Sequence, residues 1–142
     1  MTELLQCRIA VDAPQHSGLS GPLDYTSEYP LAPGSLVRVP LGRRDVAGLV
    51  WPAAQPDPRS DLPPATDAPP PTLRAVRQVV RSLAPLTPHW CDLVTFAAAY
   101  YQRGVGEVAL SVLPPELLRL DDAQLQRRID RLRRPMPRDT AP

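Results

Sequence analysis

The sequence predicts an α+β fold in which a small antiparallel, barrel-like sheet precedes a short helical subdomain. Apolar and polar residues alternate through much of the first 51 residues, as they do in strands with one wet face. A proline-rich stretch follows, and a clear helix start, Thr87-Pro88, comes after it. We therefore expect the sheet over residues 4–51 with one more strand near 73–80, and the helical subdomain over 88–113.

The first strand is expected over residues 4–11, where apolar positions recur with a period of two. A loop with two glycines and two prolines follows over 12–22, and residues 23–26 form a short, β-prone segment. Pro33-Gly34 then predicts a turn, because proline presets φ at the first corner and glycine accepts a positive φ at the second. Strand pairing should resume after this turn.

The next segment is typical of a β-hairpin with a basic tip. Two apolar runs, 35–41 and 46–51, flank Gly42-Arg43-Arg44-Asp45. Pro40 is expected at a sheet edge or at the end of its strand, because proline cannot donate a ladder hydrogen bond. The hairpin should therefore present two arginines at its tip.

A proline-rich linker is expected over residues 52–71, where eight of the twenty residues are proline and most of the others are small or polar. Such a composition buries too little apolar surface to offset the entropy of ordering. Pro69-Pro70-Pro71 is a candidate ligand for an SH3-type domain, although such runs also serve as spacers. Residues 72–115 should then hold the returning strand and the helices. Within them, residues 73–80 fit either a helix or a strand, and their valines favour the strand.

The first helix should begin with Thr87 as N-cap and Pro88 at the first helical position, and should run to about Gln102. A glycine ends it, and a second short helix is expected over 106–113, ended by Pro114-Pro115. The face that the spacing predicts as the apolar face of the first helix comprises Leu93, Phe96, Ala97 and Tyr100.

The last segment, 116–142, is expected to be a basic helix followed by a tail that is disordered from residue 135. Asp121 or Asp122 can act as the N-cap of this helix. The arginines should face water, opposite an apolar stripe. The residues of that stripe are Leu125, Ile129 and Leu132.

Composition excludes several kinds of chemistry. All 16 basic residues are arginine, so a phosphate-loop lysine and a Schiff-base lysine are both excluded, and no Gly-rich nucleotide motif occurs. Residues 1–122 hold 10 arginines against 13 acidic residues, a net charge of −3, whereas residues 123–142 hold 6 against 2, a net charge of +4. A positively charged tail favours an anionic partner.

Cysteine usage and the N-terminus indicate a cytoplasmic protein. Cys7 and Cys91 are too few for a disulfide framework or a structural zinc site, so two reduced thiols are expected. Polar residues interrupt the apolar run of the first ten residues, which therefore resembles neither a secretory signal nor a membrane span. We expect no membrane partner.

No catalytic constellation stands out. His16 lies in a Gly/Ser loop and His89 at a helix start, and neither has a cysteine or carboxylate at metal-ligand spacing, so no metal site is expected. One hypothesis is a small hydrolase that uses His16, Ser17 and Asp24 as a catalytic triad, although no G-x-S-x-G elbow supports it. Candidate phosphate contacts are Arg38, Arg43, Arg44 and Arg74 together with the arginines of the basic helix, because a planar guanidinium fork matches phosphate. The alternative for each of them is a solvated charged face.

A series of short blocks occurs in order along most of the chain. The blocks are Arg8-Ile9-Ala10-Val11, Leu23-Asp24-Tyr25, the run from Pro33 to Arg44, Val46-Ala47-Gly48-Leu49-Val50, Leu73-Arg74-Ala75-Val76, Ala99-Tyr100-Tyr101, Gly106-Glu107-Val108 and Leu113-Pro114-Pro115. Together they resemble the N-terminal 3′ DNA-binding domain of the PriA-type primosome assembly helicases. The resemblance implies a sequence-independent module that binds the 3′-hydroxyl end of the nascent leading strand at a stalled fork, during replication restart.

The same resemblance implies a 3′-end pocket in the β subdomain, residues 1–51. The carboxylate of Asp24 would accept a hydrogen bond from the terminal 3′-hydroxyl, whereas a 3′-phosphate would bring two anions together. Leu23 stands where many relatives have phenylalanine, so apolar contact replaces stacking on a ring. Gly42 would let the nucleotide approach closely, and Arg74 would contact a phosphate.

Family members are ATP-driven 3′-to-5′ DNA helicases that use magnesium, contain zinc and reload the replicative helicase. This sequence has neither the ATPase motifs nor the zinc cysteines, so we expect an end-reading module without cofactors or catalysis of its own. The partners implied are single-stranded or forked DNA with a 3′-hydroxyl end, the remaining PriA domains, other primosome proteins and single-stranded DNA-binding protein in the bacterial cytoplasm. The alternative is a protein-interaction adaptor that uses the proline-rich linker or the basic helix.

Overall fold

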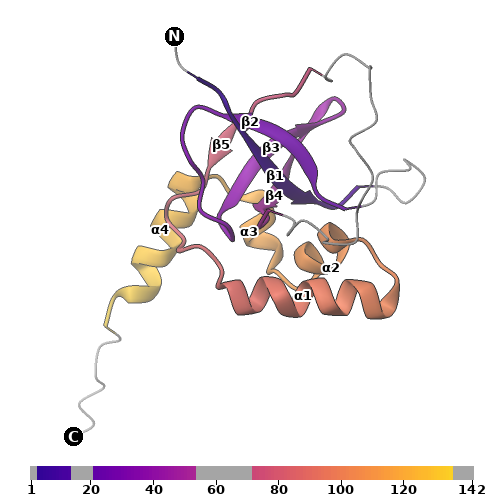
Figure 1. The fold of residues 1–142 in the computed structure, drawn as a ribbon. Helices are drawn as coiled ribbons and strands as arrows, with labels where there is room; N and C mark the ends of the chain where they lie inside the picture. Colours follow the sequence, from indigo (N-terminus) through magenta and orange to yellow (C-terminus); the bar gives the residue numbers. More distant parts are fainter. Residues whose placement is uncertain (1–2, 14–20, 54–71, 136–142) are drawn as a thin grey trace, which may run out of the picture.

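A computed structural model describes residues 3–13, 21–53 and 72–135 of the chain. It contains a curled five-stranded sheet followed by helices that pack beside it (Figure 1), so the expected α+β class and the order of the two parts are confirmed. The strands are β1 (Leu5–Val11), β2 (Leu23–Ser27), β3 (Leu36–Leu41), β4 (Arg44–Val50) and β5 (Gln78–Val79). The helices are α1 (Pro88–Tyr101), α2 (Val105–Ser111), α3 (Pro115–Arg119) and α4 (Asp122–Arg133).

The sheet has the antiparallel order β2-β1-β4-β3-β5, and the chain around β5 connects its two edges. Thr26 on β2 donates its N–H to the carbonyl of Arg74 at 3.0 Å and accepts the N–H of Val76 at 2.9 Å. Arg77 then donates its N–H to the carbonyl of Arg38 on β3 at 2.8 Å. Pairing both edges with one segment gives the sheet its barrel-like curl and leaves less open edge. The strand expected near 73–80 is thus confirmed, with a two-residue ladder.

Two glycine turns fix the register of the central strands. Ser35 donates its N–H to the carbonyl of Ala32 at 3.2 Å, and Gly34 has a φ of +90°, as the expected Pro33-Gly34 turn requires. In the hairpin, Leu41 pairs with Arg44, so the turn is Gly42-Arg43 alone, with Gly42 at a φ of +62°. The expected four-residue tip was too long, because a glycine with positive φ allows a two-residue hairpin turn.

Two apolar cores lie on opposite faces of the sheet. In β1, Ile9 and Val11 face one core and Ala10 faces the other, as the period of two predicts. A Cβ on Gly106 of α2 would overlap the backbone of Val11, so α2 packs directly on β1. The core inside the curl contains Ile9, Val11, Tyr25, Val37, Val39 and Val50. The core between sheet and helices contains Ala10, Leu36, Ala47, Leu49, Trp51, Val80, Cys91, Val94, Ala109, Leu110 and Leu125.

Helix α1 begins as expected, with the Thr87 hydroxyl accepting the N–H of Trp90 at 3.3 Å. The face that is buried was not the one expected. The spacing of Leu93, Phe96 and Tyr100 predicted the apolar face, yet these side chains are 63%, 67% and 69% exposed. Smaller residues at the same helical spacing are buried instead, and their size lets α1 pack closely against its main neighbour, α2. They are Cys91, Val94 and Ala98.

The chain after α2 forms two helices where one was expected. Pro114-Pro115 ends the α2 segment and also starts α3, since proline suits the first turn of a helix. Helix α4 has a capping box, in which Gln124 donates its N–H to the Asp121 carboxylate at 2.7 Å and its side chain accepts the N–H of Asp121 at 3.0 Å. Only the start of the expected stripe packs, because Leu125 is 3% exposed whereas Leu132 is 83% exposed.

Several expectations concern residues outside the described ranges. They include those for His16, Ser17, Pro69-Pro70-Pro71 and the tail from residue 136. Within the described ranges, no helix is both long and apolar enough to cross a membrane.

Candidate nucleic-acid interface

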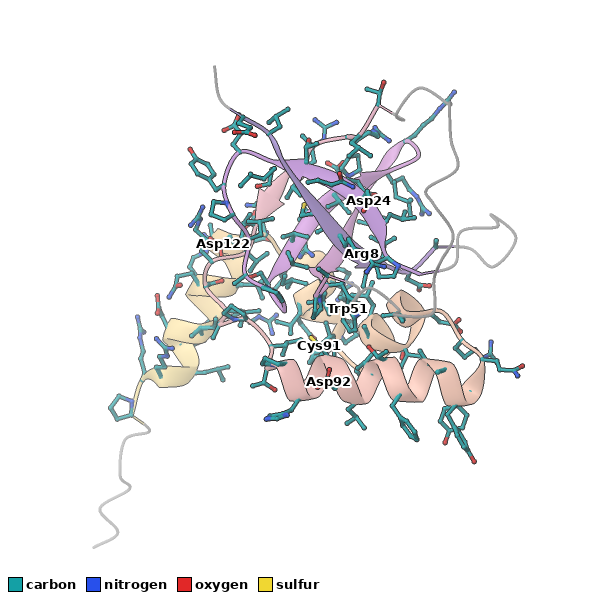
Figure 2. The ribbon with its side chains drawn as sticks, in the orientation of Figure 1. Arg8, Asp24, Trp51, Cys91, Asp92 and Asp122 are labelled. Carbon is teal, nitrogen blue, oxygen red and sulfur yellow. The ribbon has the colours of Figure 1, made fainter. Side chains whose placement is uncertain are left out.

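Strand β2 points Asp24 outward while its neighbours point into the barrel. Leu23 pairs with Ile9 and packs at the margin of the inner core, and Tyr25 is buried in that core. The Tyr25 hydroxyl donates to the carbonyl of Pro40 at 2.8 Å, which ties β2 to the end of β3. Asp24 is therefore exposed on a strand whose backbone is fixed on both sides (Figure 2).

Arg74 brings a third segment of the chain to this end of the barrel. Its Nη1 donates to the carbonyl of Gly42 at the hairpin turn, at 2.7 Å, while its own carbonyl accepts from Thr26. Burial raises the pKa of the Tyr25 hydroxyl, and the Arg74 charge opposes part of that rise. Gly42 is exposed, and no heavy atom lies within 4 Å of the position that a Cβ would take. The space beside the turn is thus open to a ligand.

Two exposed cations lie at the end of the hairpin, Arg43 in the turn and Arg44 at the start of β4. Among the residues that the structure describes, ion pairs join Arg77 to Asp45 at 3.7 Å and Arg103 to Glu107 at 3.4 Å. Neither Arg43 nor Arg44 is therefore neutralised by a described carboxylate. With Arg74 they form a cluster of positive charge beside the Leu23-Asp24-Tyr25 segment.

Arg38, a candidate phosphate contact, is not part of this cluster. Its Nη2 donates to the carbonyl of Leu117 at 2.8 Å and also to that of Leu120, at the C-terminal end of α3. Burial lowers the pKa of the Arg38 guanidinium, and the charge of Asp121 opposes that shift. A cation at the end of a helix satisfies carbonyls that lack a partner within the helix. This guanidinium links the sheet to the C-terminal helices, so we exclude it from the interface.

Comparison with known proteins identifies the family. A model of the PriA 3′ DNA-binding domain (3′BD) matches residues 8–114. The chain belongs to the PriA 3′BD family. The assignment expected from the order of the sequence blocks is thereby confirmed. The matched range begins within β1 and includes the other four strands together with α1 and α2.

Two relatives show how much of a PriA protein this chain represents. It is 36% identical over 85 residues to the replication restart protein PriA of Haemophilus influenzae, and this alignment covers 59% of this chain and 10% of that protein. It is 30% identical over 128 residues to the replication restart protein PriA of Synechocystis sp., and this alignment covers 87% of this chain and 14% of that protein. The aligned part is thus a small fraction of either relative.

One residue of this 3′BD lies beside Asp24 and was not singled out from the sequence as a ligand contact. Arg8 on β1 is directly opposite Asp24 on β2. The alternation in β1 did predict that Arg8 lies on the wet face, but the partner strand and its register were unknown. Burial raises the pKa of the Cys7 thiol, and the nearby carboxylate of Asp24 raises it further. The negative charge of Asp24 on β2 therefore acts on a side chain of the neighbouring strand β1.

Within the described residues, no group of three His, Cys, Asp or Glu side chains has a geometry that could hold a metal ion. His89 is exposed at the start of α1.

Proposed function

We propose that this chain binds the 3′-hydroxyl end of a DNA strand independently of base sequence, through Leu23, Asp24, Gly42 and Arg74. The observation that carries the proposal is the convergence of three distant segments, held together by the Tyr25–Pro40 and Arg74–Gly42 hydrogen bonds, in a chain of the 3′BD family. Each segment contributes a different element of recognition: an acceptor, an open turn and a cation.

Asp24 discriminates the end by its charge. A 3′-hydroxyl donates to the carboxylate, and such a charge-assisted bond is roughly twice as strong as a neutral one. A 3′-phosphate instead places a second anion against Asp24, which is unfavourable. The 3′-hydroxyl is present at the end of a DNA strand whatever its last base is. The contact with Asp24 therefore recognises the end of the strand and carries no information about the base sequence.

The remaining residues hold the sugar and the backbone. Leu23 is only partly buried and offers an apolar surface to the terminal deoxyribose. Arg43, Arg44 and Arg74 supply positive charge to DNA phosphates, and release of counterions from those phosphates supplies most of the affinity. Without an aromatic ring at position 23, stacking of about 1–3 kcal/mol per base is absent.

The names of the relatives indicate the process. Both are replication restart proteins, so we propose that this chain reads the nascent leading-strand end at a stalled fork during restart. It acts as a binding module in the bacterial cytoplasm, and helicase domains, other primosome proteins and single-stranded DNA-binding protein are its proposed partners. ATP, magnesium and zinc chemistry is proposed for parts of PriA proteins that lie outside the aligned residues.

The test compares two short single strands that differ only in a 3′-hydroxyl or a 3′-phosphate, titrated by fluorescence anisotropy at one salt concentration. The proposal predicts a preference for the hydroxyl that disappears in Asp24→Ala and persists in Glu28→Gln, a change at another exposed carboxylate. Equal affinity of the unmodified chain for both strands would contradict the proposal. Indifference to DNA ends combined with binding of a protein partner would favour the adaptor.

A further inference from the structure

A groove of about 510 Å³ lies between the sheet and α1. The residues of the groove that matter here are Arg8, Pro22, Trp51, Pro52, Asp92 and Thr95. Asp24 is not one of its lining residues, but it lies directly opposite Arg8 in the ladder of β1 and β2. Figure 2 shows Asp24, Arg8, Trp51 and Asp92 following one another from β2 toward α1. Arg8 therefore connects the groove to the proposed 3′-end site.

The pleat of β1 directs Arg8 into this groove. Ile9 and Val11 face the inside of the curl, and Ala10 faces the core under the helices. Side chains two apart share a face of a strand, so Arg8 lies on the side of Ala10. Its carbonyl accepts the N–H of Trp51 at 2.8 Å, which fixes the backbone at the floor of the groove. The Arg8 side chain is half-buried there.

The ladder places Arg8 beside Asp24 without pairing their charges. Directly opposite residues on neighbouring antiparallel strands lie on the same face, with Cβ atoms about 4.5–5.5 Å apart. Among the described residues, however, no ion pair joins Arg8 to a carboxylate. The guanidinium extends along the groove, and the carboxylate of Asp24 stays available to a ligand.

We propose that this groove receives the nucleotide that precedes the 3′ end, and that Arg8 binds the phosphodiester between the last two nucleotides. The inference rests on the proposed function, in which Asp24 holds the 3′-hydroxyl. Pro22, Trp51 and Pro52 offer apolar surface to the sugar. The strand then runs from Asp24 toward α1.

Asp92 fixes which wall the phosphate contacts. It lies on α1, on the wall opposite Arg8, where its negative charge repels a phosphate. The neighbouring hydroxyl of Thr95 donates to the carbonyl of Cys91 at 2.9 Å, so its proton is already used. Only the Arg8 wall is attractive to the backbone of a strand in the groove.

A double-mutant cycle between protein and DNA tests the contact. The affinity of the full chain and of Arg8→Gln is measured by anisotropy for a 3′-hydroxyl strand with either a normal or an uncharged methylphosphonate last linkage. Each change alone should weaken binding roughly tenfold, the value of one charge-assisted hydrogen bond. Both together should weaken it little further, because they remove the same interaction. The matched control, Arg44→Gln, should act independently of that linkage.

The outcomes separate this inference from the proposed function. The groove assignment would be overturned if Arg8→Gln and the uncharged linkage weakened binding independently of each other. If the preference for a 3′-hydroxyl were intact in that case, the proposed function would still stand. Absence of that preference in the unmodified chain would overturn the proposed function as well. If Arg8→Gln does not fold, as judged by circular dichroism, Asp92→Asn replaces it. Loss of this opposing charge should tighten binding about two- to fivefold, and unchanged or weaker binding would count against the groove.

Discussion

Tyr25→Phe tests whether the hydroxyl of Tyr25 holds the interface together. The side chain is 4% exposed, and its hydroxyl donates to the carbonyl of Pro40 at 2.8 Å. Removing it loses a hydrogen bond and leaves a buried carbonyl with one partner fewer. Such changes cost about 1–2 kcal/mol of the free energy of unfolding. For a urea slope of about 2 kcal/mol per M, the middle of the usual range, the midpoint should fall by about 0.5–1 M.

The control is Tyr29→Phe, because Tyr29 is 62% exposed and its hydroxyl lies at the surface. Its midpoint should change little, since surface substitutions are usually within about 0.5 kcal/mol. The affinity of Tyr25→Phe for a 3′-hydroxyl strand should also fall, because β2 is no longer tied to the end of β3. Equal midpoints for both variants and the unmodified chain would refute the reasoning. So would a loss of stability without any change in DNA affinity.

The same hydroxyl predicts a dependence on alkaline pH. Burial raises the pKa of Tyr25 above the value of 10.0 that it has in the unfolded chain. The stabilisation that the neutral Tyr25 hydroxyl gives to the folded state is therefore complete below pH 10. It is lost as the pH rises through the higher pKa of the folded state. The difference in stability between the unmodified chain and Tyr25→Phe should shrink in that window. Unfolding midpoints measured over a pH series would detect this, and a constant difference would contradict it.

Three further predictions concern the charged residues. Arg38→Met removes the donor to the carbonyls of Leu117 and Leu120 and should lower the free energy of unfolding by about 1–3 kcal/mol. Compared with the unmodified chain, hydrogen exchange should increase more in α3 and α4 than in the barrel. Arg43→Gln with Arg44→Gln should reduce the slope of log affinity against log salt by about 1.4 for single strands if each contacts one phosphate, and an unchanged slope would count against both contacts. Hydrogen bonds from the hydroxyl and the backbone N–H of Ser82 lower the pKa of Asp122, so their contribution to stability is present above pH 3.8 and is lost as the pH falls through the lower folded value. Ser82→Ala keeps the backbone bond, so acid titration of this variant should show a smaller loss of stability than the unmodified chain, and an equal loss would contradict the assignment.

The sheet was largely predictable from the sequence because its signals are local. Alternation located β1, β3 and β4, and Pro33-Gly34 located the turn before β3. The length of the hairpin tip was wrong, since the four residues 42–45 are compatible with a two-residue or a four-residue loop and the register decides between them. Strand β5 was predicted near residues 73–80, but its short length of two residues was not. The length depends on how far the segment remains paired with β3, which the local sequence does not determine.

The helical part was less predictable for reasons of packing. Residues 91, 94 and 98 and residues 93, 96 and 100 have similar helical spacings, and hydrophobicity favours the larger set. The close packing of α1 against α2 selects the smaller set instead. Arg38 reads as a surface cation in the sequence, and only the position of α3 shows that its guanidinium is engaged. For the candidate site, family blocks indicated Asp24, Gly42 and Arg74, whereas Arg8 required the register of β1 against β2.

The backbone bonds between Thr26 and the segment around Arg74 couple the proposed binding of DNA by Arg74 to the folding of the barrel. Arg74 reaches the site only when its segment is paired with β2, so a barrel that has opened at this seam lacks a donor. A strand end that binds only the closed form must then stabilise it. At a ligand concentration of one hundred times Kd the gain is about 2.7 kcal/mol. A 3′-hydroxyl oligonucleotide should thus protect the amide of Thr26, which donates to the carbonyl of Arg74, against hydrogen exchange.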